Sequence, residues 1–153
     1  MTIRFIPIST ATAWALRNGT DAYGRAPERA ISTGNGTPCR HCLQQVPAGQ
    51  VSLLLAHRPF AARHPYAETG PIFLCAADCA PGGPDLPAAI LTAPTYLLRG
   101  YDSGERIVYG TGGAVPTAQI ESHAAALLAR DDITAVHIRS ASNNCYLCKV
   151  IGE

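Results

Sequence analysis

The sequence predicts an α+β fold in which a mainly antiparallel sheet packs against two or three helices. Three observations lead to this expectation: several short apolar runs bounded by turn residues, one β-hairpin pattern, and one amphipathic helical pattern after residue 117. No internal repeat or separate second domain is evident, so we expect a single globular domain over residues 1–153.

The first half of the chain predicts one helix among short strands. Ser9 is suited to cap a short helix around Trp14, which Asn18 and Gly19 then end. The polar stretch that follows contains at most one weak helix, over Ala26–Ile31. We expect strands over residues 2–8, 51–56 and 71–75.

The second half predicts a hairpin, a longer helix and two final strands. Thr95–Tyr101 and Arg106–Tyr109 flank a turn that contains Gly104, a pattern typical of a hairpin. Thr117 is suited to cap a helix that runs to Arg130. The last strands are expected over residues 133–138 and 146–151.

The longer helix has one apolar face, which predicts how it packs. Its apolar residues recur at helical spacing and are Ile120, Ala124, Leu127 and Leu128. We expect this face to cover a sheet that contains the strands around Leu54, Leu98 and Val136.

Composition limits the class of protein. Of the 153 residues, 47% are hydrophobic and 15% are charged, which excludes a disordered chain. Lys and Arg total 12 against 11 Asp and Glu, so no basic surplus is present to neutralise nucleic-acid phosphates. No apolar run is long enough to span a bilayer, and the N-terminal one is interrupted by Pro7 and Ser9. We therefore expect a cytoplasmic protein that binds neither nucleic acid nor membranes, and the composition does not indicate an oligomeric state.

Six cysteines occur as three close pairs, Cys39 with Cys42, Cys75 with Cys79, and Cys145 with Cys148. Each C-x-x-C motif places two thiolates on one tight turn, and two such motifs supply the four ligands of a structural zinc site. In a reducing compartment, close cysteines are more often metal ligands or redox groups than disulfides. We expect Cys39, Cys42, Cys145 and Cys148 to meet in space and to bind zinc.

Other interpretations of the cysteines remain open. Cys75 ends a predicted buried strand and is suited to be a small core residue, whereas Cys79 lies in a loop. His41 could replace one of the cysteine ligands. A thioredoxin-like pair should follow a strand and open a helix, and Cys39 and Cys42 fit this pattern only in part.

Polar side chains gather at predicted strand ends and in loops. Arg99 and Tyr101 share one face of a strand, and so do His137 and Arg139. If these faces converge, the arginines form a pocket for an anionic small molecule. The expected ligand-binding residues are Arg58, Tyr66, Arg99, Arg139 and Asn144. The expected catalytic residues are Cys145, His137 and Cys39. The simpler interpretation is a solvated sheet face.

Several of these segments together resemble the bacterial domain-of-unknown-function family 1203. The matching residues, from about Pro38 to the C-terminus, are Pro38-Cys39-Arg40, Leu53-Leu54-Leu55, Pro65-Tyr66, Gly70-Pro71-Ile72-Phe73, Arg99-Gly100-Tyr101-Asp102, His137-Ile138-Arg139 and Asn144-Cys145-Tyr146. The resemblance implies a small stand-alone bacterial domain and no particular activity. It also implies that Cys39 and Cys145 belong to the family pattern. The other four cysteines are then additions in this sequence or its near relatives.

Three function hypotheses follow. The first is a small-molecule enzyme or binder with a pocket lined by Arg, His and Cys side chains. The second is a zinc-stabilised interaction module without catalysis, and the third, weaker one is a thiol-redox protein. Metal content separates them, since a four-cysteine module contains zinc and a nucleophilic thiol does not require it.

Overall fold

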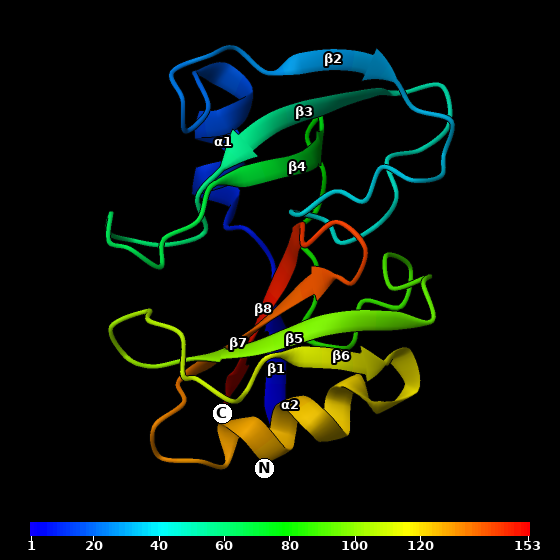
Figure 1. The fold of residues 1–153 in the computed structure, drawn as a ribbon. Coiled ribbons are helices and arrows are strands. Elements are labelled where there is room, and N and C mark those ends of the chain that lie inside the picture. Colours follow the sequence, from blue (N-terminus) through cyan, green and yellow to red (C-terminus); the bar gives the residue numbers. More distant parts are fainter.

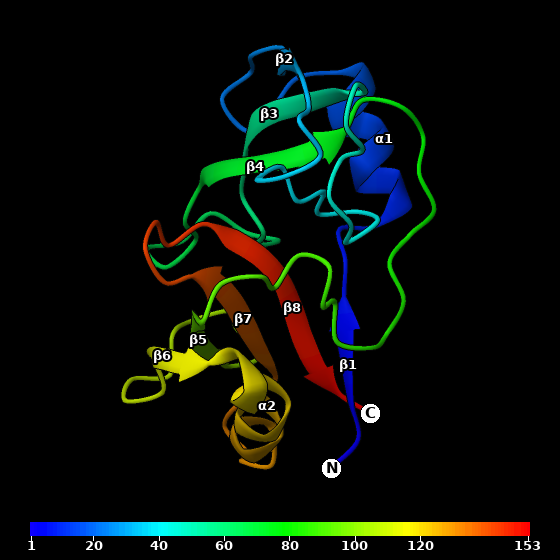
Figure 2. The ribbon, with the colours of Figure 1, turned by 90° about the vertical axis from the view of Figure 1, so that its right-hand side faces the viewer.

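The computed structural model describes all residues 1–153 and contains two antiparallel sheets, each covered by one helix (Figures 1 and 2). Its elements are β1 (Ile3–Ile6), α1 (Thr10–Asn18), β2 (Glu28–Ile31), β3 (Val51–His57), β4 (Gly70–Cys75), β5 (Thr95–Tyr101), β6 (Gly113–Pro116), the 3-10 turn η1 (Thr117–Gln119), α2 (Ile120–Leu128), β7 (Ala135–Ser140) and β8 (Tyr146–Gly152). The predicted α+β class is confirmed. No helix has the length and apolar character needed to cross a membrane.

The larger sheet has the strand order β1-β8-β7-β5-β6. Its edge strand β1 pairs with β8, and Ile3 lies opposite Gly152 in this pairing, so the two chain ends lie side by side (Figure 2). α2 covers one face, and its residues Ile120, Ala124 and Leu128 are buried against the apolar side chains of the sheet. The amphipathic pattern therefore located this helix and its buried face.

The smaller sheet has the order β2-β3-β4 and is covered by α1. Ser9 caps α1 as predicted, because its Oγ accepts a hydrogen bond from the Thr12 N–H at 3.1 Å. The buried side chains of α1, Ala13 and Leu16, form a second apolar core with Leu53 and other residues of this sheet. β3 therefore belongs to a separate sheet, and the expectation that α2 covers the strand around Leu54 was wrong.

Two further expectations are corrected by the structure. Residues 28–31 form an edge strand rather than a helix, since β2 pairs with β3 while all four of its side chains stay exposed. The expected hairpin partner Arg106–Tyr109 contributes a single bridge, between Ile107 and Tyr101. The strand that follows β5 and pairs with it along several residues is instead β6. Between the two strands the chain loops out, and in this loop Thr111 Oγ1 accepts a hydrogen bond from the Gly100 N–H at 2.9 Å.

The face of the larger sheet opposite α2 carries polar and aromatic residues. Along β5 and β7 the apolar side chains face α2, so Arg99 and Tyr101 of β5 face the other way, beside His137 and Arg139 of β7. This face looks toward the smaller sheet and toward the loop of residues 58–69, which joins β3 to β4 (Figure 1). We call these side chains, together with those of the loop that pack against them between the two sheets, the inter-sheet layer.

Candidate metal centre and inter-sheet layer

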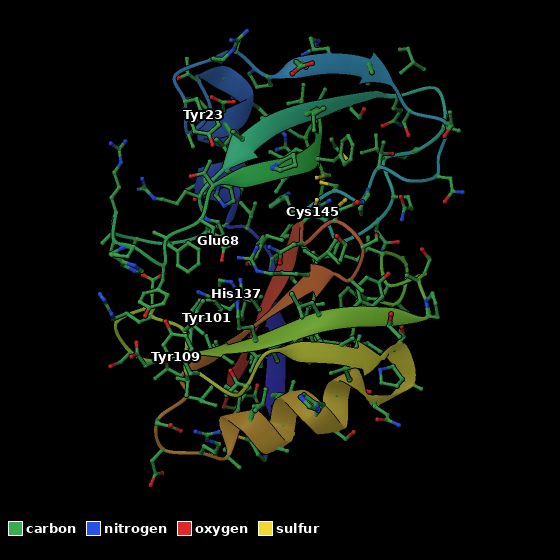
Figure 3. The ribbon with its side chains drawn as sticks, in the orientation of Figure 1. Tyr23, Glu68, Tyr101, Tyr109, His137 and Cys145 are labelled. Atoms are coloured by element: carbon green, nitrogen blue, oxygen red, sulfur yellow. The ribbon has the colours of Figure 1, made fainter.

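Four cysteine sulfurs gather where the turn after residue 38 meets the end of β4 (Figure 3). Cys39 and Cys42 lie on this turn, Cys75 ends β4, and Cys79 lies in the loop that follows. Their Sγ atoms all lie within 4.8 Å of one another, and no disulfide joins them. The four sulfurs, which we call the sulfur group, are therefore close enough to hold one metal ion.

The turn that carries Cys39 and Cys42 is closed by its own backbone. The Cys39 N–H donates to the Gln44 carbonyl, and the Leu43 N–H donates to the Cys39 carbonyl, each at 2.9 Å. Leu43 completes the turn with a left-handed backbone at φ 57°. A C-x-x-C pair on a tight turn can present both sulfurs to one ion, which is why this spacing is common in metal sites.

Hydrogen bonds fasten this turn to β4. The Arg40 N–H donates to the Phe73 carbonyl at 3.1 Å, and the Cys75 N–H donates to the Cys39 Sγ at 3.3 Å. The apolar core of the smaller sheet includes Cys39 and Cys75, which are buried. The two buried sulfurs are thus positioned by strand pairing as well as by packing.

The loop after Cys79 returns across the same turn. The Gly82 N–H donates to the His41 carbonyl at 2.8 Å. Residue 82 has no room for a side chain, because a Cβ there would lie 2.7 Å from the Leu43 side chain. This close approach keeps the loop over the sulfur group.

Cys79 Sγ is contacted by two nitrogen-bearing side chains. Arg17 of α1 donates its Nη2 N–H to Cys79 Sγ at 3.1 Å and its Nε N–H to the Cys75 carbonyl at 2.8 Å. His41 Nδ1 lies 3.1 Å from the same sulfur, and His41 Nε2 lies 2.9 Å from Thr10 Oγ1. The Arg17 side chain is only 7% exposed, so its positive charge is held against the sulfurs. His41 therefore contacts a cysteine of the group and does not replace one.

Hydrogen bonds among Cys39, Cys42 and Cys75 shift the pKa values of these three thiols in opposite directions. Hydrogen bonds from Cys42 and Cys75 lower the pKa of the Cys39 thiol. Conversely, the bond to Cys39 raises the pKa of Cys42 to about 12 and also raises the pKa of Cys75. A divalent metal ion would supply positive charge and would deprotonate the thiols that bind it.

Cys75 and Cys79 take the places in the sulfur group that the spacing predicted for Cys145 and Cys148. Cys148 is fully buried in β8, in the apolar core beneath α2, and burial raises its pKa to about 12. Cys145 is half-buried before β8, and its Sγ lies 3.8 Å from the Asn143 carbonyl. Cys145 and Cys148 therefore lie outside the sulfur group, because β8 is a regular strand that turns Cys148 into the core.

Arg40 nevertheless connects the two C-x-x-C segments. Its guanidinium is buried, with Nε donating to the Tyr146 carbonyl at 2.7 Å and Nη1 to the Pro38 carbonyl at 2.6 Å. Burial lowers the pKa of Arg40 to about 10. The segments thus touch through an arginine rather than through sulfur.

A second group of side chains lies in the inter-sheet layer, where Figure 3 labels Glu68, His137 and Tyr101. The two arginines expected to share a pocket converge on Glu68. Arg99 Nη2 lies 2.7 Å from Glu68 Oε1, and Arg139 Nη1 lies 3.1 Å from Glu68 Oε2. Sequence reasoning missed the role of Glu68, because a single acidic residue in a loop gives no signal of its own.

Aromatic rings surround His137 in this layer. Its ring centroid lies 4.2 Å from that of Tyr101, 5.0 Å from Tyr146 and 5.2 Å from Phe60. Burial, together with the charge of Arg139, lowers the pKa of His137 to about 2. The imidazole is therefore neutral at physiological pH.

The other expected ligand-binding residues lie around this layer. Arg58 donates its Nε N–H to a carbonyl of its own loop at 3.3 Å. The hydroxyl groups of Tyr66 and Tyr109 are 2.7 Å apart. Asn144 takes part through its backbone, since its carbonyl accepts from Arg139 Nη1 at 3.2 Å while its side chain is exposed.

The three residues expected to act in catalysis are not joined by hydrogen bonds. Cys39 belongs to the sulfur group, and His137 lies in the inter-sheet layer. Cys145 borders a groove of about 530 Å³ that Arg40 and Asn143 also line. The fold therefore brings Cys39 together with other cysteines rather than with His137 or Cys145.

Comparison with known proteins identifies one family. The model of the family described as "Protein of unknown function (DUF1203)" matches residues 36–151, a span that contains the sulfur group and most of the inter-sheet layer. No curated protein and no solved structure matches the chain.

Proposed function

Since the chain belongs to the DUF1203 family, whose description assigns no activity, we propose from its own geometry that it is a zinc-binding protein. The proposed ligands are Cys39, Cys42, Cys75 and Cys79. The metal would be structural, because four protein ligands leave no open position for water or substrate.

The observation that carries the proposal is the spacing of the four sulfurs. The Cys39–Cys79 and Cys42–Cys75 sulfur pairs are each 3.9 Å apart. A tetrahedral zinc site with Zn–S bonds of about 2.3 Å has sulfur–sulfur edges of about 3.8 Å. Two of the six sulfur–sulfur edges thus already match a zinc site, and the remaining edges, all within 4.8 Å, need to shorten by about 1 Å at most.

The side chains around the sulfur group support a bound cation with four thiolates. Zinc with four thiolate ligands carries a net negative charge, and the buried Arg17 lies against one of these ligands. His41 contacts the same sulfur. These contacts match the outer-shell hydrogen bonds that hold metal ligands in place in other proteins.

Zinc binding would connect three parts of the smaller sheet region. The ligands come from the turn at residues 39–42, from the end of β4 and from the loop after it, while Arg17 brings in α1. The metal would therefore stabilise this half of the molecule much as a cross-link does.

Cobalt titration tests the proposal. Co²⁺ added to the reduced, metal-free chain should produce the visible absorption of tetrahedral thiolate-bound cobalt, and Zn²⁺ should displace it because zinc binds thiolates more tightly. Cys42→Ser should lose this spectrum, whereas Cys145→Ser should keep it. A featureless cobalt spectrum in the wild-type chain would contradict the proposal.

A thiol-redox function is the alternative use of the same cysteines. It predicts that mild oxidation forms the disulfides Cys39–Cys79 and Cys42–Cys75, whose sulfurs already lie near each other. Bound zinc should prevent this oxidation, since a metal-bound thiolate is not free to attack a disulfide. Ready oxidation of the protein as purified would favour the redox function.

A further inference from the structure

Four buried side-chain polar atoms lack a hydrogen-bond partner, and all four belong to residues of the inter-sheet layer and the loop over it. They are Nε and Nη2 of Arg139, Nδ1 of His137 and Nε2 of His64. Phe60 lies beside both histidines, with ring centroids 5.2 Å from His137 and 6.0 Å from His64. Nearly all buried polar groups in folded proteins are paired, because an unpaired one destabilises the fold. Their concentration in one region leaves several buried atoms that a bound ligand could pair.

The two unpaired atoms of Arg139 form the guanidinium edge that binds carboxylates with two parallel hydrogen bonds. The Arg139 side chain is 4% exposed, and its Nη1 already contacts Glu68 Oε2 and the Asn144 carbonyl. Elsewhere in the chain, Arg130 uses the same edge, and its Nε and Nη2 donate to the two carboxylate oxygens of Asp132 at 2.9 and 2.7 Å. Arg139 therefore offers a buried two-pronged donor without an acceptor.

The charges of the layer also leave one negative charge missing. Arg99 and Arg139 carry two positive charges, and Glu68 supplies one negative charge between them. The neighbouring His137 has no hydrogen-bond partner at its Nδ1, so it is free to pair with a further polar group. One additional monoanion would balance the two arginines, of which Arg139 is buried and Arg99 partly buried, and unbalanced buried charge is costly.

The aromatic side chains of the layer indicate which kind of anion would fit. The rings of Tyr101, His137, Tyr146 and Phe60 pack beside the arginines, and the Arg139 guanidinium carbon lies 5.9 Å from the Tyr146 ring centroid. Flat aromatic walls suit a planar group better than a tetrahedral, strongly hydrated phosphate. We propose that the inter-sheet layer binds a small-molecule carboxylate, held by the Nε–Nη2 edge of Arg139 beside Glu68. The site is separate from the sulfur group and does not depend on zinc.

The loop of residues 58–69 covers this site, with Phe60 and Glu68 packed against the layer and the rest of the loop held by exposed contacts. Tyr66 and Tyr109 join through their hydroxyl groups, and the Ala61 N–H donates to Glu105 Oε1 at 3.0 Å. Exposed polar contacts contribute little to stability. Admission of the carboxylate therefore depends mainly on movement of Phe60 and Glu68, which are the residues of this loop that pack against the layer.

Carboxylate titration of the full-length protein tests the proposal. Acetate, benzoate and, separately, phosphate are added at constant ionic strength, and binding is followed by calorimetry and by NMR shifts of the arginine side chains. We expect saturable binding of benzoate or acetate to the wild-type protein. Arg139→Lys should weaken it by about tenfold or more, because lysine cannot form the paired bonds. Arg130→Gln is the matched control and should bind as the wild type does.

Glu68→Gln provides a second, independent variant. It removes the negative charge next to the two arginines, so carboxylate binding should become several-fold tighter, whereas a purely structural Glu68 would not change binding. This result decides the question even if Arg139→Lys does not fold. The proposal is overturned if neither carboxylate binds the wild-type or the Glu68→Gln protein, if only phosphate binds, if Glu68→Gln binds no more tightly than the wild type, or if a folded Arg139→Lys protein binds as tightly as the wild type.

Discussion

Substitution of one proposed zinc ligand should destabilise the chain by an amount that the fold allows us to calculate. Cys42→Ser is the suitable change, because Cys42 is only half-buried and its loss removes little packing. Its Sγ lies 3.9 Å from that of Cys75, which is 33 residues away along the chain. A metal bound by both residues closes this loop and so restricts the unfolded chain.

The chain-entropy relation for a cross-link gives the magnitude. For a loop of 33 residues it predicts about 4 kcal/mol of stabilisation. A chain of this size loses about 2–4 °C in Tm per kcal/mol, so Cys42→Ser should lower the Tm by about 8–16 °C. The assay is thermal unfolding of proteins prepared in the presence of zinc, followed by circular dichroism with and without a strong chelator.

Cys145→Ser is the matched control, since Cys145 is also half-buried but lies outside the sulfur group. Its Tm should stay near that of the wild type, and chelator should lower the Tm of both proteins. Chelator should not lower the Tm of Cys42→Ser any further, because no zinc remains to be removed. Equal melting of the two serine variants, or an equal response of all three proteins to chelator, would refute the reasoning.

Three further predictions concern the surroundings of the sulfur group, the larger sheet and the inter-sheet layer. Arg17→Gln should weaken zinc affinity about 10–100-fold in a competition titration, as loss of an outer-shell partner does, whereas Arg25→Gln on the exposed surface should not. Leu128→Ala should lower the free energy of unfolding by roughly 2–5 kcal/mol in urea, and Leu127→Ala, which is only partly buried, by less. The pKa of His137 is about 2 in the folded chain, below its ordinary value of 6.5. As the pH falls below 6.5, the unfolded chain therefore binds a proton at His137 and the folded chain does not. His137→Phe should therefore reduce the loss of stability below that pH by about 1.4 kcal/mol per pH unit.

Each of these three predictions has an outcome that contradicts it. Equal zinc affinity of the Arg17→Gln and wild-type proteins would show that the N–H···S contact has no effect on the metal. A cost for Leu127→Ala as large as that for Leu128→Ala would contradict the orientation of α2. An unchanged slope of stability against pH in His137→Phe would mean that His137 binds its proton equally well in the folded and unfolded chain.

The sequence predicted the elements that have their own local signals. Ser9 at the start of α1 and the apolar face of α2 are local patterns, since one is a cap and the other a helical repeat. Residues 26–31 were expected to form at most a weak helix. All four side chains of β2 are exposed, so no buried face signals a strand, and only pairing with β3 makes it one. The division into two sheets also has no local signal, because it depends on which apolar runs pair.

Prediction of the two sites from the sequence was limited in the same way. The sequence predicted that Cys39 and Cys42 join a second cysteine pair, but the C-x-x-C pattern favoured Cys145 and Cys148 over the longer spacing of Cys75 and Cys79. Strand alternation placed Arg99 on one face of its strand and Arg139 on one face of its own, and these faces converge, yet nothing in the sequence indicated that Glu68 would lie between the two arginines. The order of the strands decides which residues from distant parts of the chain meet in a site. Local sequence patterns do not contain this information.

The most direct test of the zinc proposal is the metal content of the full-length chain purified without chelator. Elemental analysis together with protein quantification should find about one zinc ion per chain, as a single four-cysteine site requires. Cys42→Ser purified in the same way should contain almost none, and Cys145→Ser should match the wild type. A wild-type chain that contains no zinc and cannot take it up when reduced would contradict the central claim.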